Sequence, residues 1–160
     1  MSFPQPLRAV VTGAGSGLGR ALALDLAGRG ASVVVSDINP TSAEETAERI
    51  RDQGARVEVV KCDITDRDAV FALVDEAERR LGGIDLLANN AGVAVSPHSK
   101  TVQGFETHFG VNHLGHFALT GLLLERLLKT AGSRIVTVSS VSHKLGHFDF
   151  DDPHWEEPVY

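Results

Sequence analysis

Thr12-Gly13-Ala14-Gly15-Ser16-Gly17-Leu18-Gly19 is the stretch of this 160-residue sequence that decides its fold. It follows a short apolar run, residues 7–12, and opens an amphipathic segment from Leu18 to Arg29. The run predicts a buried strand, and the leucines at every fourth position of the segment predict one face of a helix. A strand, a glycine-rich turn and a helix present free backbone N–H groups and a positive helix end to a phosphate. The pattern therefore indicates a nucleotide cofactor.

The spacing of the glycines narrows this prediction. They do not fit G-x-G-x-x-G, because that pattern would need a glycine at Leu18 or at Arg20. They fit T-G-x-x-x-G-x-G, whose fixed positions are Thr12, Gly13, Gly17 and Gly19. The alternative is an ordinary tight turn between a strand and a helix. Glycine allows positive φ and close approach of the backbone to a ligand, so four glycines in eight residues favour the cofactor turn.

Strand-like and helix-like patterns alternate along the rest of the chain. Further strands are predicted at 32–36, 56–61, 84–88 and 134–139, and helices at 41–53, 65–81 and 101–129. A capping box, Thr41-Ser42-Ala43-Glu44, fits the start of the first of these helices. The last helix is entered through a looser first turn near Gly104 and Gly110. Apolar strands joined by helices predict an α/β fold with a doubly wound parallel sheet, the Rossmann fold. We expect its core at 1–145 and an irregular segment at 146–160.

Composition bounds the possible functions. The net charge of −6 gives no support to nucleic-acid binding. No apolar stretch approaches the length of a membrane helix and no signal peptide is recognisable, so we expect a cytoplasmic protein. Cys62 is the only cysteine, which excludes an internal disulfide. The seven histidines have no carboxylate or cysteine at ligand spacing, so no metal site is predicted.

Polar residues follow three of the predicted strands, where a doubly wound sheet binds its ligand. Asp37 stands 18 residues after Gly19, the position of a carboxylate that binds the adenine ribose; a cap or turn before the next helix is the alternative. Such a carboxylate would repel a 2′-phosphate, which favours NAD over NADP. Asp63, followed by Ile64, could bind the adenine amino group or cap a turn. Asn89-Asn90-Ala91-Gly92 could let a cofactor pass closely or form a simple turn, and its amides could tie strands together.

Two further residues could take part in catalysis. Asn112 lies within the predicted helix 101–129, where asparagine is a poor choice, so either a specific hydrogen bond or simple exposure explains it. Ser140 ends the last predicted strand, and its hydroxyl could hold a substrate oxygen. Nothing resembles G-x-S-x-G, so a nucleophilic serine is not supported.

Together these motifs resemble the short-chain dehydrogenase/reductase family, in its classical type. The resemblance covers the chain from Leu7 onward and is carried by Thr12 to Gly19, Asp37, Asp63, Asn89 to Gly92, Asn112 and Ser140. The second half, Lys100 to Phe117 and Ser139 to His143, is similar to the retinol-dehydrogenase-like branch, which acts on lipophilic alcohols and carbonyls.

The resemblance implies hydride transfer between NAD and an alcohol or ketone. Ser140 would orient the substrate oxygen, and Asn112 would hold a water. Cofactor contacts are implied for Gly13, Gly15, Ser16, Gly17, Leu18, Gly19, Asp37, Asp63, Ile64, Asn89, Ala91 and Gly92. The family's Y-x-x-x-K does not occur, because Tyr160 is the only tyrosine and no lysine follows it. We therefore expect a chain truncated before the catalytic tyrosine, with an incomplete sheet and little activity alone.

Two alternatives to that enzyme remain open. The first is a non-catalytic NAD-binding module. The second is a structural half whose missing part comes from another chain. For the full-length form, the resemblance implies a homo-oligomer.

Overall fold

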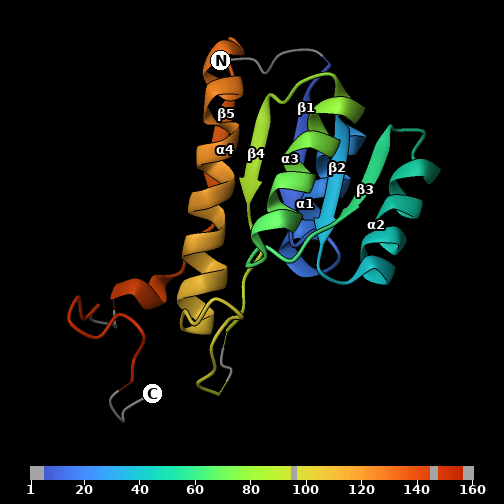
Figure 1. Ribbon diagram of the computed structural model, residues 1–160. Coiled ribbons are helices and arrows are strands. Elements are labelled where there is room, and N and C mark those ends of the chain that lie inside the picture. Colours follow the sequence, from blue (N-terminus) through green and yellow to red (C-terminus); the bar gives the residue numbers. More distant parts are fainter. Residues whose placement is uncertain (1–5, 95–96, 145–147, 157–160) are drawn as a thin grey trace.

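The fold is built on one parallel sheet, as the computed structural model shows for residues 6–94, 97–144 and 148–156. Its five strands lie in the order β3-β2-β1-β4-β5 (Figure 1). They are β1 Arg8–Thr12, β2 Ser32–Asp37, β3 Val57–Lys61, β4 Leu86–Asn89 and β5 Arg134–Thr137. All four pairs of neighbours are parallel. The doubly wound parallel sheet predicted from the sequence is thereby confirmed.

Helices cover both faces of the sheet. They are α1 Gly17–Gly28, α2 Pro40–Asp52, α3 Arg67–Leu81 and α4 Gly115–Lys129, with a π-helix η1 Phe109–Leu114 before α4 and a 3₁₀ turn η2 Val141–Lys144 after β5. One apolar cluster joins α1 and α2 to Val33 and Val35 of β2. A second joins α3 and α4 to Val34 of the same strand. Successive side chains of β2 thus pack into the helical layers on opposite faces of the sheet, which explains its unbroken apolar run.

The predicted capping box at Thr41 is wrong. Asn39 is the N-cap of α2, and its Oδ1 accepts hydrogen bonds from the backbone N–H groups of Thr41 (3.0 Å) and Ser42 (3.2 Å). Pro40 occupies the first helical position, where its missing N–H costs nothing. The asparagine–proline pair therefore begins the helix one residue before the expected start.

The continuous helix predicted over 101–129 is also wrong in its first part. Lys100 and Glu106 form an isolated antiparallel bridge, and Gly104 has a φ of +89°. The π-helix η1 follows, and regular α-helix begins only at Gly115. The looser entry expected near Gly104 and Gly110 is therefore a turn followed by a π-helix.

A partly buried ion pair joins the amino ends of the neighbouring strands β1 and β4. The guanidinium of Arg8 in β1 donates through Nε and Nη2 to the two carboxylate oxygens of Asp85, each at 2.8 Å. The Asp85 carboxylate is 1% exposed and also accepts the backbone N–H of Arg8 at 2.9 Å. These hydrogen bonds lower the pKa of Asp85. Both carboxylate oxygens are satisfied, as burial of a charge requires.

Residues 148–156, the described part of the segment predicted to be irregular, form turns and bends. Tyr160 lies outside the described residues. Among the helices that the structure describes, none is both long and apolar enough to cross a membrane. Within the same residues, no cluster of three or more His, Cys, Asp or Glu side chains is placed to hold a metal ion.

Candidate functional site

A cavity of about 500 Å³ lies at the carboxyl ends of β1, β2 and β4. The chain leaves β1 toward the layer of α1 and leaves β4 toward the layer of α4, so the strand order reverses between these two strands. This is the position at which open α/β sheets bind ligands. The predicted site residues that line the cavity are Gly13, Ser16, Gly17, Leu18, Gly19, Asp37, Asp63, Ile64, Ala91 and Gly92.

The glycine turn presents the start of α1 to this cavity. Ser16 is the N-cap residue in an extended conformation, and within the described residues its side chain makes no capping hydrogen bond. The turn also lies tightly on the strand beside it. A Cβ atom at Gly19 would come within 2.2 Å of the Gly13 carbonyl oxygen and 2.4 Å of Asn90 Nδ2. Only glycine fits there, and the helix start remains open to an anion.

Thr12 and Asn90 hold the turn against β4, and they are residues that the sequence analysis did not assign to the site individually. The Thr12 hydroxyl accepts the backbone N–H groups of Asn90 (2.9 Å) and Ala91 (3.0 Å). Asn90 Nδ2 donates to the Thr12 carbonyl oxygen at 2.9 Å. Both line the cavity. The signal available in the sequence was their position at the ends of neighbouring strands.

His116 of α4 also belongs to this network, through a contact with the Thr12 hydroxyl. Its Nε2 lies 3.0 Å from the Thr12 hydroxyl, and its Nδ1 lies 3.3 Å from the carbonyl oxygen of Asn112. The ring is 4% exposed, and burial lowers its pKa. The ring is therefore neutral at physiological pH. It links α4 to the strand end that carries the glycine turn.

Asp37 lies at the rim of the cavity with both carboxylate oxygens held by the backbone. Its Oδ2 accepts the N–H of Gly15 at 2.8 Å, and its Oδ1 accepts the N–H of Asn39 at 2.9 Å. Each carboxylate oxygen has a second lone pair, so the group still has acceptor capacity for hydroxyl groups. Asn39, and not Asp37, supplies the cap of α2. Gly15 supports Asp37 from beside the cavity.

Asp63 and Asn89 have structural partners in the described molecule. Oδ1 of Asp63 accepts the backbone N–H (2.9 Å) and the hydroxyl (2.8 Å) of Thr65, which forms a turn at the cavity wall. Asn89 is buried, and its Nδ2 donates to the hydroxyls of Thr120 (2.9 Å) and Thr137 (3.4 Å). The Asn89 amide thus ties β4 to α4 and β5, as the sequence interpretation allowed.

Asn112 and Ser140 have different surroundings. Asn112, in η1, clasps the backbone of Val93, accepting its N–H at 2.8 Å and donating to its carbonyl oxygen at 2.9 Å. Val93 lines the cavity, so Asn112 shapes the cavity wall. Ser140 is exposed, and its hydroxyl contacts Ser142 Oγ at 3.1 Å. Among the described residues near it, Val138 reaches the cavity wall instead.

Cys62 follows β3 and also lines the cavity. Its side chain is buried, and burial, together with Asp63 and Asp66, raises the pKa of the thiol to about 12. A protonated thiol is neither a nucleophile nor a good metal ligand. Cys62 therefore contributes an apolar surface to the cavity.

The comparisons with known proteins agree with this geometry. The family model described as short chain dehydrogenase matches residues 8–150. Retinol dehydrogenase 12 of Mus musculus is 44% identical over 145 residues, which cover 89% of this chain and 46% of that protein. Retinol dehydrogenase 13 of Homo sapiens is 41% identical over 157 residues, which cover 94% and 46%. The chain thus spans about half the length of the curated relatives it matches.

The solved structures give the same result. A 7α-hydroxysteroid dehydrogenase complexed with NADH and 7-oxo glycochenodeoxycholic acid has a TM-score of 0.79 and 33% identity, covering 91% of this chain and 58% of that one. An uncharacterized protein from Mycobacterium paratuberculosis has a TM-score of 0.83 and 41% identity, covering 99% and 56%. With the cavity at the strand-order reversal and its T-G-x-x-x-G-x-G turn, these matches show that the chain belongs to the short-chain dehydrogenase family.

Proposed function

We propose that the chain binds NAD in the cavity at the ends of β1, β2 and β4, and that it forms the cofactor half of an oxidoreductase. The family uses NAD or NADP and acts on small molecules. The observation that carries the choice of NAD is the Asp37 carboxylate at the cavity rim, held by two backbone N–H groups. A fixed negative charge accepts ribose hydroxyls and repels a 2′-phosphate.

The remaining contacts follow from the cavity. The uncapped start of α1 would hold the pyrophosphate, with Ser16, Gly17 and Leu18 closest to it. Asp63 and Ile64 would line the adenine end, and Ala91 and Gly92 would lie beside the middle of the cofactor. The bound cofactor supplies hydride chemistry. Asn112 supports the cavity wall through Val93, and the Ser140 hydroxyl would hold the oxygen of the substrate.

The proposed substrate is a lipophilic alcohol or carbonyl compound. The retinol dehydrogenases and the hydroxysteroid dehydrogenase that resemble this chain are named for such molecules. The alcohol carbon would give up its hydride to the bound cofactor, and the hydroxyl proton would be released to solvent; reduction of the carbonyl compound would run the same exchange in reverse. Absorbance of NADH tests it when a chain extended through a Y-x-x-x-K segment is incubated with a panel of lipophilic alcohols, with Ser140→Ala expected to slow turnover and to leave NADH affinity unchanged. Turnover that is identical in the variant would contradict the role of Ser140.

Calorimetric titration with NADH and NADPH tests the cofactor. We expect NADH to bind more tightly, and Asp37→Asn to weaken NADH binding about tenfold or more, because it removes charge-assisted hydrogen bonds. Asp52→Asn is the matched control, since Asp52 is exposed at the far end of α2. Absence of binding heat for both cofactors would overturn the proposal.

A further inference from the structure

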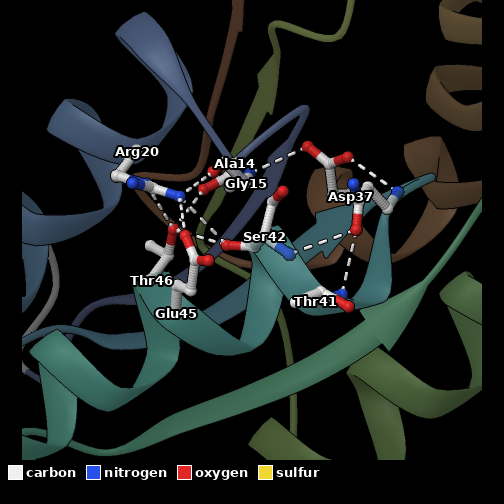
Figure 2. A network of polar contacts seen from close by, with 9 residues as sticks. Ala14, Gly15, Arg20, Asp37, Thr41, Ser42, Glu45 and Thr46 are labelled. Atoms are coloured by element: carbon white, nitrogen blue, oxygen red, sulfur yellow. Dashed lines mark hydrogen bonds and ion pairs between the residues drawn. The ribbon is translucent and has the colours of Figure 1, made fainter.

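A second polar network lies behind the glycine turn and is centred on Arg20 (Figure 2). The Arg20 side chain extends from α1 toward α2, where its Nε donates to the Thr46 hydroxyl at 2.9 Å and its Nη2 donates to Glu45 Oε2 at 3.0 Å. The same Nη2 donates to the carbonyl oxygens of Gly15 and, at 3.3 Å, of Ser42. One guanidinium thus joins the turn to the first half of α2.

Thr46 forms a hydrogen bond to the peptide between Ala14 and Gly15. Its side chain is fully buried, and its hydroxyl lies 2.9 Å from the Ala14 carbonyl oxygen and 3.1 Å from that of Ser42. Two successive carbonyl oxygens, those of Ala14 and Gly15, are therefore held on the α2 side of the turn. The peptide that carries the Ala14 oxygen also carries the Gly15 N–H, and this N–H points to Asp37 Oδ2.

Packing leaves this peptide little freedom. A Cβ atom at Gly15 would come within 2.8 Å of the Asp37 carboxyl carbon and 3.0 Å of the Ser42 Cβ. The turn is therefore clamped between α2 and the Asp37 carboxylate (Figure 2). Because a planar peptide fixes its N–H opposite its carbonyl, holding the Ala14 oxygen also aims the Gly15 N–H.

From these contacts we propose that Arg20, acting with Thr46, is a positioning residue for cofactor selection. The two side chains fix the turn so that the Gly15 N–H holds the Asp37 carboxylate at the cavity rim. The inference rests on the proposed NAD site and deepens it. Among the described residues that line the cavity Arg20 is absent, and its charge is paired with Glu45, so it acts through the turn and not on the cofactor.

The test measures a ratio, the affinity for NADH divided by the affinity for NADPH, by calorimetry. We expect Arg20→Met and Thr46→Val each to lower this ratio about three- to tenfold. This is the effect expected when the hydrogen bond from the Gly15 N–H to the Asp37 carboxylate is weakened. Arg29→Met is the matched control, because Arg29 is the C-cap residue of the same helix and its side chain pairs only with the exposed Asp25 among described contacts. The control should leave the ratio unchanged.

Two further variants separate positioning from general stability. Arg20→Lys keeps the charge and loses the planar fork, so it should lower the ratio as Arg20→Met does. In an Asp37→Asn background, Arg20→Met should no longer change the ratio, because the group it positions is gone. Thermal unfolding followed by circular dichroism identifies variants that are folded. Should Arg20→Met fail to fold, the nearly isosteric Thr46→Val carries the test.

The outcomes distinguish this inference from the proposed function. In one outcome the wild-type chain binds NADH preferentially while the folded variants Arg20→Met and Thr46→Val keep the wild-type ratio. That result would overturn the positioning role but would not contradict the NAD site. A full rescue by lysine, or an equal change in the Asp37→Asn background, would also overturn it. A wild-type chain that binds neither cofactor overturns the proposed function itself.

Discussion

The two ends of the central strand pair, β1 and β4, solve the same packing problem with different chemistry. At the amino end a charged pair, Arg8 and Asp85, joins the strands. At the carboxyl end the neutral groups of Thr12 and Asn90 join them, and His116 of α4 contacts the Thr12 hydroxyl. At the charged end both carboxylate oxygens of Asp85 are occupied by hydrogen bonds from Arg8. The neutral end lies beside the uncapped start of α1, and the cavity opens there.

This difference separates stability from binding along a single strand. Arg8 and Thr12 are four residues apart in β1. The ion pair fixes the register of the two strands, while the threonine network fixes the turn that faces the ligand. A change at either end should therefore produce a distinct combination of stability and affinity effects.

The largest effect is expected at the charged end. Asp85→Ala should lower the free energy of unfolding by about 3 kcal/mol, because it leaves the partly buried guanidinium of Arg8 without its carboxylate. Urea unfolding measures this loss. NADH affinity of the folded variant should stay within about twofold, and Asp25→Ala, at an exposed pair, is the control. A large fall in affinity would show that the two ends are coupled.

A smaller loss of stability is expected at the neutral end, together with an effect on binding. Thr12→Val removes the acceptor of two backbone N–H groups and should cost about 2 kcal/mol of unfolding free energy. It should also weaken NADH binding, since the turn loses its anchor on β4. Thr12→Ser keeps the hydroxyl and should retain both properties. Equal affinity in the valine and serine variants would contradict the link between anchor and turn.

The smallest effect concerns pH. Burial lowers the pKa of His116, so as pH falls below 6.5 the unfolded chain takes up a proton that the folded chain resists. Stability contributed by the neutral ring is present above this pH and is lost as pH falls through the folded pKa. The pKa of Asp85 is lowered from 3.8, so the stability contributed by its carboxylate is also lost on acidification, but only in strongly acidic solution. The neutral end should therefore weaken first on acidification.

Urea midpoints measured on either side of pH 6.5 check this order. His116→Gln should flatten the dependence in this window, whereas His143→Gln, at an exposed histidine, should leave it as in the wild type. An unchanged slope in His116→Gln would show that other groups are responsible for it.

The fold and the position of the cavity could be predicted because they depend on local signals. Glycine spacing marked the turn, and unbroken apolar runs marked the buried strands. The partners of individual polar residues could not be predicted, since they come from elements far apart in the sequence. Asn89 reaches Thr120 and Thr137, and Arg20 reaches Glu45 and Thr46. The π-helix at Phe109–Leu114 could not be predicted for a different reason: it is six residues long and runs directly into α4, which is too short a stretch for its wider turn to alter the apolar pattern.

Cys62 gives the molecule a built-in reporter. It is the only cysteine, it lies in the cavity wall, and its thiol stays protonated. Its exposed fraction is only 5%, so a thiol reagent reaches it slowly, through the cavity or when the end of β3 opens. A ligand held in the cavity suppresses opening in proportion to its occupancy. Protection of one sulfur atom thus converts occupancy of the cavity into a labelling rate, with no substitution introduced into the sequence.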